Sequence, residues 1–142
     1  MNHKELCERA VKWLRGTAGC GVVISEMASY ADEIPDAIGW RSGVSVLIEA
    51  KASRADFFAE KKKMARHYPQ NGMGKWRFFI TKPGLISPDE LPEGWGLLEV
   101  HGNIVKRIHG VPKGNIWPIS PHKANRNAEI LLLCSALRRE RE

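Results

Sequence analysis

The sequence predicts an α/β protein in which a mixed sheet of about five to six strands is flanked by helices. Apolar residues recur at helical spacing near the start of the chain and again after residue 53. Several short runs between and after these segments are rich in β-branched and aliphatic residues, as strands are. The expected order of elements is α-β-β-β-α-β-β-β-α. At 142 residues, the chain has the length of a single domain, 1–142.

The first two elements are a helix and a strand. The helix is expected over His3 to Arg15, because its apolar residues form one stripe at helical spacing and Gly16 then ends it. The strand is expected over 22–28. Glu26 is its charged residue, and it is either a buried group with a partner near a site or a surface glutamate on an edge strand.

A hairpin follows, with strands expected over 34–40 and 44–51. The residues between them supply a polar turn in which Gly43 can take a positive φ. The second strand is apolar until its last residues, which include Glu49 and Lys51. It therefore combines a buried body with a charged end.

The charges at the end of this hairpin point to a site. Glu49 and Lys51 share a face, with Cα atoms roughly 6–7 Å apart, because side chains alternate along a strand. Asp36 lies near the same end if the hairpin pairs around its turn. Two carboxylates and an amine at the end of apolar strands are costly to desolvate without partners. A divalent cation and a phosphate would supply them.

The second half of the chain contains two helices and three strands. A helix over 53–68 is expected to start at Ser53 as N-cap and to end before Pro69. A last helix is expected to open with Ser120 as N-cap and Pro121 as its first residue. The strands between them are expected over 75–81, 95–100 and 104–108.

The composition describes a soluble, basic protein. Lys and Arg number 22 against 16 Asp and Glu, a net charge of +6 that favours a polyanionic partner such as nucleic acid. No apolar run approaches the ~20 residues that span a bilayer. The first residues do not lead into a signal-peptide core, so a cytoplasmic location without membrane attachment is expected.

Other catalytic and metal-binding patterns are missing from the sequence. The three cysteines are far apart and lack a CxxC pair, and the five histidines show no HExxH. No G-x-S-x-G, P-loop or GxGxxG motif occurs. We therefore expect no disulfide framework, no zinc site and no serine hydrolase chemistry.

The hairpin residues Pro35-Asp36 and Glu49-Ala50-Lys51 resemble the motif of the PD-(D/E)xK nuclease superfamily. The second half of that motif also occurs at Glu60-Lys61-Lys62, but there it falls in an expected helix. The flank from Ser53 to Phe57, and the strands after it, resemble the small MmcB-type DNA-repair proteins of this superfamily. The resemblance covers about residues 26–100 and implies a restriction-endonuclease-like core.

The resemblance also implies a Mg²⁺-dependent DNA nuclease, with Mn²⁺ able to substitute. Asp36, Glu49, the Ala50 carbonyl and Glu26 would hold the metal, as hard oxygen donors do. Lys51 would polarise the attacking water or neutralise a phosphate oxygen. Structure- or end-specific cutting in DNA repair, recombination or mobile-element processing is expected. The proposed DNA contacts are Arg54, Lys62, Arg41, Lys82 and, by stacking on an unpaired base, Trp40.

Two alternatives stay open at this stage. Asp36, Glu49 and Lys51 could form an ion-pair network at a sheet edge, without any catalytic role. The same fold could also bind DNA or a protein partner without cleaving. RNA in place of DNA, and a homodimer in place of a monomer, are further open points.

Overall fold

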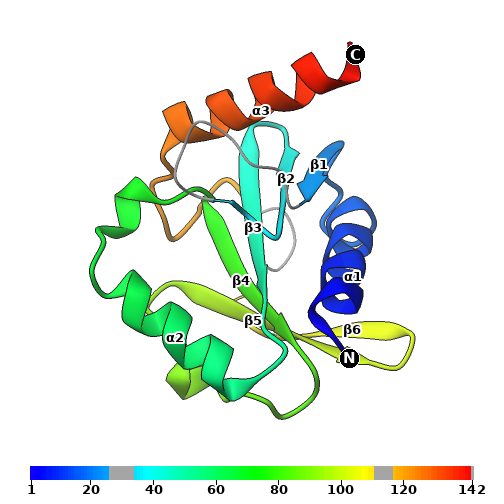
Figure 1. Ribbon diagram of the computed structural model, residues 1–142, viewed down its shortest axis with the longest axis vertical. Helices are drawn as coiled ribbons and strands as arrows, with labels where there is room; N and C mark the ends of the chain where they lie inside the picture. Colours follow the sequence, from blue (N-terminus) through cyan, green and yellow to red (C-terminus); the bar gives the residue numbers. More distant parts are fainter. Residues whose placement is uncertain (26–33, 111–116, 142) are drawn as a thin grey trace.

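The computed structural model describes residues 1–25, 34–110 and 117–141, and it contains one mixed six-stranded sheet with three helices around it (Figure 1). The predicted α/β class and the order α-β-β-β-α-β-β-β-α are confirmed. The elements are α1 (His3–Arg15), β1 (Val22–Ser25), β2 (Ala37–Arg41), β3 (Val44–Ala50), α2 (Arg54–Met64), β4 (Trp76–Thr81), β5 (Trp95–His101), β6 (Ile104–His109) and α3 (Arg126–Glu140), with short 3-10 turns η1 (Pro69–Asn71) and η2 (Pro88–Glu90).

The strands lie in the sheet in the order in which they occur in the sequence. β1, β2 and β3 form an antiparallel meander, β3, β4 and β5 are parallel, and β6 returns antiparallel to β5. Parallel neighbours need a crossover connection. α2 provides it between β3 and β4, whereas residues 82–94 with η2 provide it between β4 and β5. The carboxyl ends of β3, β4 and β5 therefore lie at one edge of the sheet.

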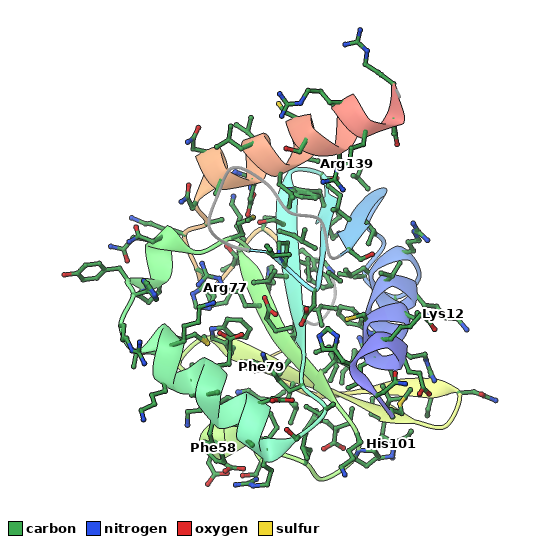
Figure 2. The ribbon with its side chains drawn as sticks, viewed as in Figure 1. Lys12, Phe58, Arg77, Phe79, His101 and Arg139 are labelled. Carbon is green, nitrogen blue, oxygen red and sulfur yellow. The ribbon has the colours of Figure 1, made fainter. Side chains whose placement is uncertain are left out.

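Two apolar layers cover the two faces of the sheet. α1 packs across β1 to β4 and buries the stripe that predicted it, including Leu6 and Leu14. α2 and α3 cover the other face, toward which the labelled Phe79 of β4 points (Figure 2). There Phe57 of α2 packs against Phe79 with 5.1 Å between ring centroids. Along β3, Ile48 faces α1 and Leu47 faces α2 and α3. Glu49 follows Leu47 onto the α2 face by alternation.

The ends of two helices differ from the prediction. α2 ends at Met64, not at residue 68, and Tyr68 is extended and 71% exposed. Its position before Pro69 disfavours helical backbone. α3 begins at Arg126, not at Pro121, because Asn125 caps it by accepting the Ala128 N–H at 3.1 Å.

Two buried charges, Arg77 and Glu129, hold the loop before β4. The Arg77 guanidinium donates to the carbonyls of Pro69, Gly72 and Gly74, while Glu129 accepts the Gly74 N–H at 2.8 Å. Their relative exposures are only 4% and 2%. These contacts tie α3 and the sheet to the same loop.

Among the helices of the described ranges, none is both long enough and apolar enough to cross a bilayer.

Candidate active site at the carboxyl end of β3

Asp36 and Glu49 meet at one end of the β2–β3 hairpin. Because Ala37 pairs with Ile48, the residue before it, Asp36, lies opposite Glu49, where Cβ atoms are typically about 4.5–5.5 Å apart. The Asp36 carboxylate is close enough to Glu49 to raise the pKa of the Glu49 carboxyl. Asp36 Oδ2 also accepts the Ala50 N–H at 2.8 Å. The hairpin thus brings together the two carboxylates that the motif predicted.

The charge balance around Glu49 favours a bound cation. Burial raises the pKa of the Glu49 carboxyl well above its usual range, and the neighbouring Asp36 and Glu60 carboxylates raise it further, against the opposing effect of Lys51. Two adjacent carboxylates that cannot both remain charged at low cost are relieved by a divalent cation. Their oxygens are the donors that Mg²⁺ takes, so the donor set fits this ion.

Lys51 is paired at the same end of the sheet. Its Nζ lies 3.0 Å from Glu60 Oε1 of α2, and the two side chains are only 15% and 18% exposed. The Lys51 N–H donates to the Ile80 carbonyl of β4 at 3.1 Å, so its backbone continues the sheet. The amine is therefore held close to the acidic pair in a partly desolvated setting.

Glu60 is a site residue that the sequence analysis set aside as part of a helix. The structure places it on α2, facing Lys51. A usable signal was its position three residues after Phe57, which is fully buried, because residues i and i+3 share a helix face. The ion-pair alternative groups Lys51 with Asp36 and Glu49, whereas Lys51 forms its ion pair with Glu60.

An open pocket of about 320 Å³ lies at this edge of the sheet. Ligand pockets commonly have volumes of roughly 300–1,000 Å³. The pocket spans the start of α1, the end of β3 and one face of α2, lined by His3, Ala50, Lys51, Asp56, Ala59, Glu60 and Lys63. Lys51 and Glu60 are thus open to a ligand that enters from solvent.

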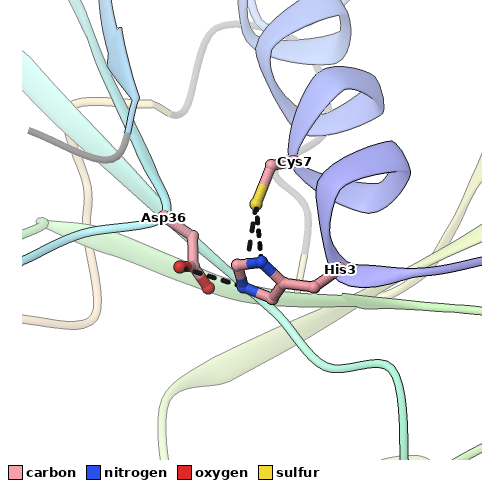
Figure 3. Close-up of side chains that lie close together, drawn as sticks. All are labelled: His3, Cys7 and Asp36. Carbon is pink, nitrogen blue, oxygen red and sulfur yellow. Dashed lines mark hydrogen bonds and ion pairs between the residues drawn. The ribbon is translucent and has the colours of Figure 1, made fainter.

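The start of α1 also reaches Asp36. His3 Nε2 lies 3.2 Å from Asp36 Oδ1, and the Cys7 thiol contacts the imidazole from the next turn of the helix (Figure 3). The sequence analysis assigned no role to either residue. The sequence shows that His3 and Cys7 are four residues apart on one helix, but it does not show that they face Asp36.

No protein-family model matches the chain, and no curated protein matches it. A solved structure of a protein of unknown function from Silicibacter pomeroyi has a similar fold, with a TM-score of 0.64 and 23% sequence identity. The match covers 98% of this chain and 89% of that one. The likeness concerns the fold alone.

Two of the predicted DNA contacts, Lys82 and Lys62, are exposed lysines that directly follow β4 and lie on α2, respectively. Lys82 follows β4 at the edge where Lys51 follows β3, and it is exposed. Lys62 is exposed on α2, next to the pocket residue Lys63. These side chains can reach a polyanion that lies across the carboxyl ends of the strands.

Arg54 has structural partners of its own. Its guanidinium forms a forked pair with the Glu90 carboxylate at 2.8 and 3.1 Å and donates to the Leu85 carbonyl at 2.8 Å. The Arg54 guanidinium lowers the pKa of Glu90 to about 2. Arg54 thus fastens the β4–β5 connection to the start of α2.

Trp40 and Arg41 lie at the far end of β2 from Asp36. The five residues of β2 span roughly 17 Å. Trp40 Nε1 donates to Glu129 at 3.4 Å, and Arg41 donates to the Ala18 carbonyl at 2.8 Å. The structure does not bring this pair to the acidic site. Glu26 lies outside the described residues.

Proposed function

We propose that this protein is a Mg²⁺-dependent nuclease that hydrolyses phosphodiester bonds in DNA. The observation that carries the proposal is the pair of carboxylates, Asp36 and Glu49, that the hairpin register sets opposite each other, with Lys51 at the same strand end. The motif resemblance adds the expected class of reaction. A structure- or end-specific endonuclease of DNA repair, recombination or mobile-element processing is the form we favour.

The roles of the residues follow from their chemistry. Asp36 and Glu49 would hold Mg²⁺, with the Ala50 carbonyl as a further ligand. The bound ion would act as a Lewis acid on the phosphate and as a template for the attacking water. Lys51 would place its ammonium group against a phosphate oxygen or the attacking water, and Glu60 would hold that ammonium in position when no substrate is present.

The substrate class follows from the surrounding charge. The protein carries a net charge of +6, and exposed lysines lie on α2 and directly after β4, namely Lys62, Lys63 and Lys82. Lysines that neutralise phosphates release counterions, which makes binding favourable and dependent on salt. DNA is the polyanion that we propose, and RNA is tested alongside it.

The direct test is cleavage of plasmid, flap, single-stranded and junction DNA, and of RNA, with Mg²⁺ or Mn²⁺. Wild type should cut at least one of these, whereas Asp36→Ala and Glu49→Gln should not. Glu140→Gln, which alters a carboxylate at the end of α3, is the matched control and should cut like wild type. Absence of cleavage of every substrate at high protein concentration would overturn the proposal.

A second candidate is a non-catalytic module that binds DNA or a protein partner. The Lys51–Glu60 ion pair favours it, because it already gives the lysine a partner within the fold. This function predicts that binding persists after chelation and that Asp36→Ala changes little. A calorimetric Mn²⁺ titration of wild type and Asp36→Ala separates the two candidates, since the nuclease requires the variant to lose metal binding.

A further inference from the structure

A second set of metal-ligand atoms lies beside the acidic pair, at the start of α1. It comprises a ring nitrogen of His3, the sulfur of Cys7 and a carboxylate oxygen of Asp36, and these atoms all lie within 4.8 Å of one another. Figure 3 shows the imidazole between the thiol and the carboxylate. Nitrogen, sulfur and oxygen donors together are typical of borderline and soft metal ions, not of Mg²⁺.

The fold holds two of these ligands in place. Asn2 caps α1 by accepting the Glu5 N–H at 2.8 Å, so His3 and Cys7 lie on ordered successive turns. Residues four apart on a helix are neighbours on its surface. Cys7 is 5% exposed against the sheet, whereas the His3 side chain is 49% exposed. The thiol is thus held by packing, and the imidazole has room to turn.

Two of the three distances between donor atoms suit tetrahedral coordination. With ligand bonds of about 2.0–2.3 Å, neighbouring donors around a tetrahedral ion lie roughly 3.3–3.8 Å apart. His3 Nε2 and Asp36 Oδ1 are 3.2 Å apart, and Cys7 Sγ and His3 Nε2 are 3.8 Å apart. A small rotation of the imidazole would direct Nε2 toward the common point between all three.

We propose that His3, Cys7 and Asp36 bind a divalent cation of the zinc class, with water as the fourth ligand. Binding converts the Cys7 thiol to a thiolate, and the proton passes to solvent. His3 also lines the open pocket, which gives the ion and its water a path from solution. The site is distinct from the Mg²⁺ site in its donors but shares Asp36 with it.

The shared aspartate gives the zinc-class site a consequence for activity. An ion that takes Asp36 Oδ1 draws that carboxylate toward α1 and away from its pairing with Glu49. We therefore expect Zn²⁺ to antagonise Mg²⁺-dependent cleavage. This consequence rests on the proposed nuclease function, whereas the site itself does not.

Co²⁺ is the probe for the site, because a thiolate ligand gives Co²⁺ a charge-transfer absorption that the free ion lacks. Titration of reduced protein with Co²⁺ alone should produce this band at one equivalent, and added Zn²⁺ should remove it. Cys7→Ala should lose the band, and His3→Gln should weaken Co²⁺ binding at least tenfold. Cys134→Ala and His67→Gln, which alter an exposed cysteine and an exposed histidine elsewhere, are matched controls and should bind like wild type.

The outcomes are decisive whether or not the protein cuts DNA. No band in wild type at millimolar Co²⁺, or an undiminished band in Cys7→Ala, overturns the site. Because Cys7 is buried, the exposed His3 provides the variant that tests the site if Cys7→Ala fails to fold.

Glu49→Gln separates the metal site from the nuclease proposal. This variant should keep the Co²⁺ band whatever its effect on cleavage, so failure of the nuclease proposal and failure of this site are told apart. If Zn²⁺ still inhibits cleavage by His3→Gln, the inhibition does not come from this site. That result would overturn the proposed antagonism and leave the metal site itself standing.

Discussion

Glu49 lies half-buried between Asp36 and Glu60, and its raised pKa has a consequence for stability. A carboxyl whose pKa is raised by folding binds its proton more tightly in the folded state than in the unfolded state. The free energy of unfolding then falls as the pH rises from the unfolded value, about 4.3, through the folded value. Through Glu49, the metal-free protein should therefore have a lower free energy of unfolding at neutral pH, where the carboxyl tends to ionise, than at a pH where the carboxyl is protonated in both states.

Glu49→Gln should raise the melting temperature at neutral pH in the presence of EDTA. Glutamine keeps the shape and a hydrogen-bond donor but removes the charge that burial and Asp36 oppose. A gain of about 1 kcal/mol would correspond to roughly 3–5 °C in a chain of this length. Thermal unfolding from pH 4 to pH 8 measures it, with Glu140→Gln as control. A variant that melts below wild type at every pH would show that Glu49 is stabilised by its neighbours.

Lys51→Met should leave Mn²⁺ binding largely intact while removing most cleavage. The lysine is not a metal ligand, but its ammonium is the positive group beside the acidic pair. Loss of one preorganised group that stabilises transition-state charge commonly costs about 10²–10³ in rate. Calorimetry and a cleavage assay on the same preparation measure the two effects. Lys12→Met, an exposed lysine of α1, is the matched control. Full activity of Lys51→Met would remove this residue from the mechanism.

Among the elements, α3 is attached to the sheet through a buried carboxylate. Glu129 accepts hydrogen bonds from Ser45 Oγ at 2.7 Å, the Gly74 N–H at 2.8 Å and the Arg126 guanidinium at 3.0 Å. These donors come from β3, from the loop before β4 and from α3 itself. One side chain thus joins three segments that are far apart in the sequence.

Glu129→Ala should destabilise the protein by about 2–4 kcal/mol, because it leaves buried donors without their acceptor. Chemical denaturation measures the free energy of unfolding. Glu140→Ala, at the exposed end of the same helix, should change it by less than about 0.5 kcal/mol. Equal effects of the two substitutions would mean that the buried network contributes no net stability.

Over the whole molecule, the exposed lysines on α2 and after β4 predict how the proposed DNA binding should respond to salt. Lys62→Ala and Lys82→Ala should each weaken binding and reduce the slope of log affinity against log salt by about one. Arg41→Ala, at the far end of β2, should leave the slope unchanged. Fluorescence anisotropy at several salt concentrations measures these slopes. If Arg41→Ala changed the slope and the two lysine variants did not, the DNA-binding surface would lie at the opposite end of the sheet from Asp36 and Glu49.

Local patterns account for most of the architecture. The stripe that includes Leu6 and Leu14 predicted α1 with its bounds, and the apolar run from Val44 predicted β3 to within one residue. The turn between β2 and β3 fixed the register that sets Asp36 opposite Glu49. Periodicity and turn chemistry are properties of neighbouring residues, and the sequence displays them directly.

The remaining features depend on contacts between distant segments. Ser120 and Pro121 have the chemistry of a helix start, but Asn125 becomes the cap, where its N–H also donates to the Gly72 carbonyl. Glu60 and His3 enter the site because α2 and α1 bring them to the end of β3. No local rule identifies which strand end a helix residue will reach.

The position of His3 beside Asp36 affects how the protein should be prepared. A polyhistidine tag fused ahead of Met1 would place extra imidazoles next to the acidic pair, where they would capture metal and distort every titration described above. The last residues of α3 lie at the opposite end of the molecule from Met1 (Figure 1). Purification handles therefore belong after residue 142, or should be removed by proteolysis before any metal is added.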